Sequence, residues 1–175
     1  TAIPYLISKI NFQNRNVVIE ICNSLLLCGY IAKDEHEQQQ LLQLLEENIK
    51  ITAWNINIQN NLQKDTFSKD LKASFSNEIN ENIDFIFLIL SIKHDPSSIR
   101  NVRENLETGT SESISFAIEL LDLFVDERIK QILFTLFDDV SDVDKIRRFQ
   151  DHFPLERYSD TDLLNAIINR DNNYI

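Results

Sequence analysis

Apolar residues recur every three or four positions along almost the whole chain, which is the spacing of one face of an α-helix. The longest example follows Asp34 and Glu37, a pair typical of a helix start, and continues to about residue 62. The pattern predicts a helix of about 28 residues and about 42 Å. Its apolar face is formed by Leu41, Leu42, Leu45, Ile49, Thr52, Ala53 and Ile56.

A second long helix is predicted over residues 71–90, after a polar break at residues 64–68. From Phe85 this helix is apolar on all sides, so we expect neighbours around it. Residues 49–58 contain Ile, Thr and Trp, which favour strands, but the leucine periodicity runs straight into them and favours a helix. Shorter helices are expected over residues 3–10, 14–28, 96–109, 111–125, 126–136, 141–149 and 159–168.

The turns between these segments carry helix-start and helix-stop residues. Asn14 and Asp95-Pro96 suit the first positions of a helix, and Gly29 and Gly109 suit the end of one. Glycine and proline are scarce, with only 2 and 3 in the whole chain. Tight β-turns and glycine-rich phosphate loops need these residues, so the composition disfavours β-sandwiches, Rossmann folds and P-loop enzymes.

The fold class predicted is therefore all-α, with antiparallel helical hairpins stacked as a short, irregular α-solenoid. We expect residues 1–175 to form one domain of this kind. The chain starts at Thr1 and contains no methionine, so we expect it to be a fragment of a longer protein.

The net charge of −11 and the pI near 4.6 argue against binding to phosphate backbones, which would need a basic surface. The nearest basic cluster is Lys145, Arg147 and Arg148. Four aspartates, Asp138, Asp139, Asp142 and Asp144, lie just before it. We therefore expect protein partners and no nucleic acid.

Residues with chemical potential are few and separated. Cys22 and Cys28 are expected to be two small buried hydrophobic residues in a reducing compartment, because six helical positions turn the thiols to different faces. His36 belongs to an acidic first helical turn, and His94 and His152 lie at helix ends or in loops.

The acidic run at residues 138–144 has no glycine and places Val140 and Val143 among the acids. It therefore fits a helix end, a turn and a new helix capped by Ser141 better than a calcium loop. From these observations the sequence predicts no catalytic residues, no cofactor-binding residues and no metal site, and hence no enzyme.

Two stretches resemble HEAT repeats, which are pairs of antiparallel helices stacked side by side. In the first, Ile3-Pro4-Tyr5-Leu6-Ile7 leads through Asn11 to Val17, Ile21 and Leu25. In the second, residues 99–124, Ser113, Ala117 and Leu121 align with those last three positions. The arginine that commonly follows the valine of such repeats is absent, since Val18 and Ile114 occupy its place.

Residues 95–139 are also similar to helical-repeat regions attached to transporter-like membrane proteins of bacteria. That resemblance implies a soluble regulatory part of a transport protein. No segment of this chain reaches the roughly 20 apolar residues that cross a bilayer. The expected location is cytoplasmic, at the membrane face if the parent is a membrane protein.

The first functional hypothesis is a non-catalytic scaffold or interaction module that presents an acidic surface to a protein partner or to other domains of its own chain. The transporter-linked regulatory domain is an alternative. A helical-repeat enzyme with an unrecognised site is another. The oligomeric state stays open.

Overall fold

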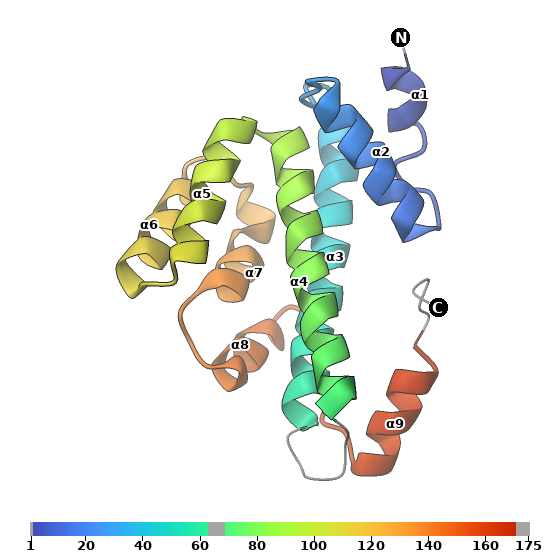
Figure 1. The fold of residues 1–175 in the computed structure, drawn as a ribbon, viewed down its shortest axis with the longest axis vertical. Coiled ribbons are helices and arrows are strands. Elements are labelled where there is room, and N and C mark those ends of the chain that lie inside the picture. The colour runs from blue at the N-terminus through green and yellow to red at the C-terminus, as the bar shows by residue number, and fades with distance from the viewer. Residues whose placement is uncertain (1, 63–68, 171–175) are drawn as a thin grey trace.

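A computed structural model describes residues 2–62 and 69–170 of the chain (Figure 1). Every regular element in these stretches is an α-helix, and the helices pack against one another, so the all-α prediction is confirmed. The predicted polar break at 64–68 lies outside the described residues. In chain order the helices are α1 (Ile3–Ile7), α2 (Arg15–Leu27), α3 (Glu35–Asn61), α4 (Lys69–Lys93), α5 (Pro96–Thr108), α6 (Ser111–Asp122), α7 (Glu127–Phe137), α8 (Asp142–Phe149) and α9 (Asp160–Ile168).

The helix starts follow from short side chains that accept hydrogen bonds from the first free backbone N–H groups. Asp34 accepts from the backbone N–H of His36 at 2.9 Å, and Asp95 accepts from that of Ser98 at 2.8 Å. Asn14, Asp126, Ser141 and Ser159 cap four further helices in the same way. Helix α6 is capped by Thr110, one residue before the predicted start. Residues 49–58 lie inside α3, so their assignment to a helix is confirmed.

Three expectations near the N-terminus are wrong. Helix α1 ends at Ile7 instead of Ile10, because the following residues form tighter turns with i to i+3 bonds. Val17, which apolar spacing places on the expected core face with Ile21 and Leu25, is exposed, since the buried side of α2 is rotated towards Val18. Cys28, expected to be buried, is an exposed residue just after α2, whereas Cys22 is buried as predicted.

The two longest helices, α3 and α4, form an antiparallel pair along the length of the molecule (Figure 1). Helix α2 packs on one side of this pair, and α5 to α8 lie on the other side. Consecutive helices also pair, as α1 with α2, α5 with α6 and α7 with α8. Because α4 contacts α2, α3 and α5, its all-round apolar character at residues 85–90 is explained.

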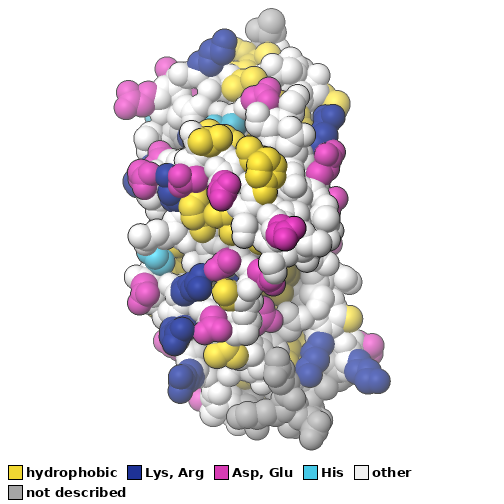
Figure 2. Space-filling view, turned by 90° about the vertical axis from the view of Figure 1, so that its left-hand side faces the viewer, with side chains coloured by type: hydrophobic (Ala, Val, Ile, Leu, Met, Phe, Trp, Pro, Cys, Tyr) yellow, Lys and Arg dark blue, Asp and Glu magenta, His cyan; other side chains and the backbone are white. Residues whose placement is uncertain are grey.

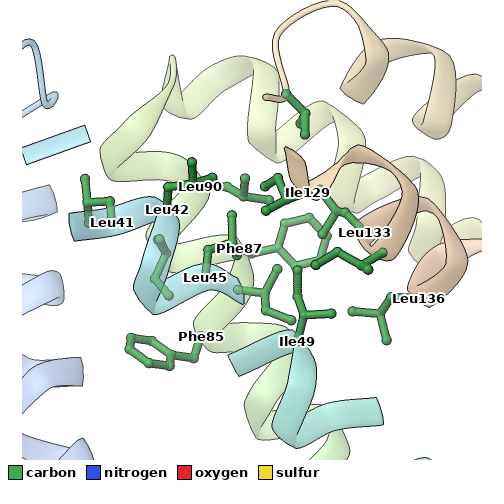
Figure 3. Close-up of a cluster of buried hydrophobic side chains, with 14 of the residues drawn as sticks. Leu41, Leu42, Leu45, Ile49, Phe85, Phe87, Leu90, Ile129, Leu133 and Leu136 are labelled. Atoms are coloured by element: carbon green, nitrogen blue, oxygen red, sulfur yellow. The ribbon is translucent and has the colours of Figure 1, made fainter. Parts of the chain in front are cut away.

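The main core lies where α3, α4 and α7 meet (Figure 3). Phe87 of α4 stacks on Phe137 of α7 with ring centroids 5.3 Å apart. Side chains from the three helices converge there, among them Leu41, Leu42, Leu45, Ile49, Leu90, Ile129, Leu133 and Leu136.

A second, smaller apolar cluster holds α9 at the far end of α3 and α4. Its buried members are Ile58, Leu62, Phe75 and Leu163. Arg170, just beyond α9, forms an ion pair with Glu78 at 2.6 Å. The guanidinium of Arg170 also lies 5.3 Å from the Trp54 ring and 5.2 Å from the Phe75 ring. Helix α9 is therefore attached to the rest of the protein by this small apolar cluster and by the half-buried guanidinium of Arg170.

Within residues 2–62 and 69–170, none of the helices combines the length and the apolar character that a bilayer crossing requires.

Two isoleucines on α3 provide a test of this core. Ile49 of α3 is fully buried where this helix meets α4 and α7 (Figure 3), whereas Ile51 of the same helix is 40% exposed. We predict that Ile49→Ala lowers the free energy of unfolding by about 2–5 kcal/mol, because it leaves a cavity. Ile51→Ala, the matched control, should change it by about 0.5 kcal/mol or less. Urea unfolding followed by circular dichroism measures both, and equal effects would contradict the described core.

Candidate functional site

An apolar stripe on α6 stays exposed on the side of the molecule formed by α5 to α8. Phe116, Leu120 and Leu123 follow one another at helical spacing, and we name these three residues the α6 stripe. Phe116 is 50% exposed and Leu123 is 79% exposed, whereas Leu120 is half-buried. The buried positions of α6 are Ala117 and Leu121, which pack into the core.

Acidic residues border the α6 stripe. Glu112 and Glu119 fall along one edge of it by helical spacing, and both are exposed. Neither forms an ion pair with another residue of the described stretches. Asp122 contacts Lys130 at 2.8 Å. Figure 2, which looks onto this side of the molecule, shows apolar side chains gathered in the upper half with Asp and Glu among them.

A groove of about 660 Å³ runs over α4 between α2 and α5, and we name it the α4 groove. Each of the three helices contributes one stripe at helical spacing, because the groove follows their adjoining sides. The floor is apolar, with Phe85 and Leu88 of α4, and Ile19 and Leu26 of α2 extend this apolar surface. The polar and charged lining residues are Arg15, Asn16, Asn23, Glu81, Asp84, Ser91, Arg100 and Arg103.

Arg15 stands at one end of the α4 groove. Its guanidinium carbon lies 5.4 Å from the centroid of the Phe85 ring. Burial lowers the pKa of Arg15 to about 10, while Glu78 and Glu81 act in the opposite direction. The group therefore remains a cation at neutral pH.

Arg103 separates the α4 groove from a second hollow of about 470 Å³. Its guanidinium contacts Asp84 at 2.6 Å and Glu107 at 2.7 Å, and lies 5.5 Å from the centroid of the Phe87 ring. Both Arg103 and Phe87 line the two hollows. The second hollow continues between α4, α5, α6, α7 and α8.

Lys145 of α8 lines the second hollow, and its side-chain amine is held there by a hydrogen bond to the protein backbone. The amine donates a hydrogen bond to the backbone carbonyl of Leu136 at 2.8 Å, near the C-terminal end of α7. Burial lowers the pKa of Lys145, although three nearby aspartates oppose the shift. An amine that caps a helix end in this way has a structural role.

The basic cluster named from the sequence is paired with acids. Arg147 contacts Asp144 at 3.1 Å, and Arg148 contacts Asp138 at 2.6 Å. With Lys145 bonded to a backbone carbonyl, the three basic side chains do not form a free positive patch. The run at 138–144 is a helix end, a turn and a new helix capped by Ser141, as predicted.

The structure keeps the histidines and cysteines apart. His36 is an exposed residue in the first turn of α3, and His152 is exposed beyond α8. His94 follows α4 directly, which agrees with the predicted helix-end position. Among the described residues, no group of three or more His, Cys, Asp or Glu side chains is arranged to hold a metal ion.

The sequence did not point to the α4 groove or the α6 stripe. A signal existed for the stripe, since Phe116 and Leu123 are apolar positions beside the predicted core face of α6. For the groove, Ile19 and Leu26 lie off the core stripe of α2, and Arg100 and Arg103 share one side of α5. Sequence alone does not show that these residues of α2 and α5 face each other across α4.

His94 gives a prediction about pH. Its ring centroid lies 5.0 Å from that of Phe124, and its buried Nε2 has no hydrogen-bond partner among the described residues. Burial lowers the pKa of His94 from 6.5 to about 4, and the neighbouring Lys93 adds to this effect. Between these two pH values the unfolded chain binds more protons at this position than the folded chain.

We therefore expect His94 to make the free energy of unfolding fall as the pH decreases from 6.5 towards 4. Replacement by Phe, which cannot bind a proton, should remove this part of the pH dependence. Urea unfolding of the wild type and of His94→Phe, measured at several pH values, tests it. The difference at pH 7 to 8 gives the packing effect alone, and a constant difference down to pH 4 would contradict the assignment.

Comparisons with protein-family models, curated proteins and solved structures gave no match to this chain. The resemblance to HEAT repeats and to transporter-linked helical regions therefore stays a prediction.

Proposed function

We propose that the chain is a non-catalytic helical-repeat interaction module, and that the α6 stripe with its acidic border is its main binding surface. The observation that carries this proposal is an exposed apolar stripe on a helix whose buried side is already packed. Apolar surface of this kind, bordered by charge, is typical of sites where another protein docks.

The charge around the stripe selects the partner. Residues 104–127 contain seven acidic residues and neither lysine nor arginine. Apolar burial supplies the affinity of such a contact, and the acidic border supplies orientation and a faster encounter. The expected partner segment is therefore an amphipathic helix with an apolar face flanked by Lys or Arg, from another protein or from another domain of the same chain.

Self-association through the α6 stripe is the weaker alternative. Two copies facing each other would bring their Glu112 and Glu119 side chains together, and each chain has a net charge of −11. Like charges at one interface are unfavourable, whereas a basic partner relieves the same charge. The paired state of Arg147 and Arg148 also favours a protein partner over a nucleic acid.

The helix pairing supports a repeat-like organisation. Helices α1–α2, α3–α4, α5–α6 and α7–α8 are consecutive packed pairs, which is the unit of a helical repeat. In a straight stack each pair contacts only its neighbours. Here α3 also contacts α7 and α8, so the proposed solenoid is short and strongly curved around the α3–α4 pair. The described residues offer no specific observation in favour of the two alternative functions.

A synthetic peptide tests the proposed surface. The probe is a dye-labelled amphipathic helix of about 20 residues, with leucines on one face and lysines along both flanks. We predict that it binds the protein and that Phe116→Ser weakens the binding about tenfold, because this substitution removes the exposed aromatic anchor of the stripe. Fluorescence anisotropy gives the Kd, which should rise with salt concentration because the acidic border is exposed.

Phe12→Ser is the matched control. Phe12 is 53% exposed against 50% for Phe116, and it lies before α2, on the other side of the α3–α4 pair. This variant should bind the peptide like the wild type, and circular dichroism should show unchanged helix content in both variants. Equal Kd values for the wild type and Phe116→Ser would rule out the α6 stripe as the binding surface.

A further inference from the structure

The guanidinium of Arg170 occupies a cluster of side chains that has the chemistry of a cation site. The rings of Trp54 and Phe75 lie 5.3 and 5.2 Å from it. Its nitrogens donate hydrogen bonds to Glu78 at 2.6 Å and to Asn55 at 3.1 Å. Aromatic faces, a carboxylate and an amide oxygen around one planar cation are the groups that recognise a guanidinium. We name Trp54, Asn55, Phe75 and Glu78 the cation cage.

The cation cage is built by α3 and α4, without α9. Trp54 also packs against the main core, and its indole N–H donates to the Tyr158 hydroxyl at 3.3 Å. The side-chain amide of Asn57 donates to the backbone carbonyl of Glu156 at 2.9 Å, so the segment before α9 is held on α3 as well. Because these contacts do not involve α9, the cage keeps its walls when α9 leaves.

Helix α9 is an incomplete occupant of this site. Among the helices of the described residues, α9 alone packs closely along none of the others. Leu163 is buried, but Leu164 and Ile168 stay exposed. In the cage, Oε1 of Glu78 and Nδ2 of Asn55 are buried and have no hydrogen-bond partner in residues 2–62 and 69–170. Buried polar atoms without a partner weaken an association, so α9 does not use all the binding capacity of the cage.

The charges around the cage favour a cation as its occupant. Arg15 of α2 is another cation near Glu78, and it also faces Glu81. Without Arg170, this group consists of two carboxylates and one guanidinium. The surplus of negative charge attracts an incoming cation, and the negative faces of the aromatic rings oppose an anion.

We propose that the cation cage is a docking site for a helix of a partner protein, and that α9 is the intramolecular occupant which this helix replaces. The partner helix carries the pattern of α9, with apolar residues in the places of Leu163 and Ile167 and an arginine in the place of Arg170. Arginine suits the site better than lysine, because its planar fork can pair with both oxygens of Glu78. This site is separate from the α6 stripe and does not depend on the function proposed for it.

The α9 helix of a second copy is the competing occupant. Ser159, the N-cap of α9, directly follows Tyr158, which is bonded to Trp54 of the same chain. Helix α9 therefore has no free linker with which to reach another copy. The net charge of −11 on each chain also opposes association between copies. A helix from a partner protein is favoured because neither constraint applies to it.

The test uses a dye-labelled helical peptide of about 20 residues, with leucine, isoleucine and one arginine at the α9 spacing and otherwise uncharged side chains. It should bind the wild type weakly, because α9 competes from within the same chain. Arg170→Gln empties the cage and should lower the Kd about tenfold. Leu163→Ser, which loosens the apolar side of α9, should lower it as well. Arg157→Gln is the matched control, because it removes the same charge at an exposed arginine and should leave the Kd within about twofold.

A second peptide, with glutamine in place of the arginine, shows whether the cage recognises the cation. It should bind the Arg170→Gln protein about tenfold more weakly than the first peptide does. Adding Glu78→Gln should remove this difference between the peptides. Adding Glu104→Gln instead, at an exposed glutamate of α5, should preserve it. Circular dichroism should show that all variants keep the helical core.

Three results would overturn the proposal. One is an equal Kd for the wild type and Arg170→Gln, and another is equal binding of the two peptides to Arg170→Gln. The third is association of the wild-type protein in sedimentation that Arg170→Gln abolishes, because the occupant would then be a second copy. Phe116→Ser should leave the Kd of the arginine peptide unchanged, so the outcome here is independent of the outcome for the α6 stripe.

Discussion

The packing of α3 against α4 is the contact on which the rest of the structure depends. These helices are the longest of the described chain, and each other helix from α2 to α8 packs on one of them or on a partner that does. Most of their buried residues are apolar, as at Ile49 and Ile86, although α3 also buries Asn48, Thr52, Asn55 and Asn57. A buried hydrogen bond joins the two helices at one defined position, where the Asn48 side-chain amide donates to the backbone carbonyl of Asn82 at 3.0 Å. That bond fixes how far one helix can slide along the other.

Both candidate surfaces follow from this central pair. Helices α2, α3 and α5 each cover one side of α4. The strip of α4 that stays uncovered between α2 and α5 is the floor of the α4 groove. Helices α5 and α6 form a hairpin that buries one side against α4 and α7, so the α6 stripe stays on the outside. The same chain thus presents an exposed apolar stripe with an acidic border and a groove with an apolar floor.

The extent to which sequence predicted this structure depends on how local each signal is. Asp34 and Asp95-Pro96 mark helix starts through bonds to residues two or three positions away, so their effect can be recognised without the fold. Val17 and Val18 are both apolar neighbours on α2, and only the position of α4 decides which one is buried. The α4 groove joins residues 15–26, 81–91 and 96–103, so no single segment contains its pattern. Helix starts were predicted because they depend on neighbouring residues. The buried face of α2 and the α4 groove were not, because they depend on where distant helices lie, which apolar spacing does not specify.

The attachment of α9 has a consequence for spectroscopy. The only tryptophan of the chain, Trp54, packs against both the main core and the small cluster beneath α9, and it lies against the guanidinium of Arg170. The main core is a separate apolar cluster, and segments held by few buried contacts open before the rest of a protein. The release of α9 removes the Arg170 guanidinium from the Trp54 ring, so intrinsic tryptophan fluorescence responds to this release as well as to the later loss of the main core. Far-ultraviolet ellipticity reports the melting of the whole helical assembly. A fluorescence transition at lower denaturant than the ellipticity transition would be the optical trace of one helix leaving an otherwise folded protein.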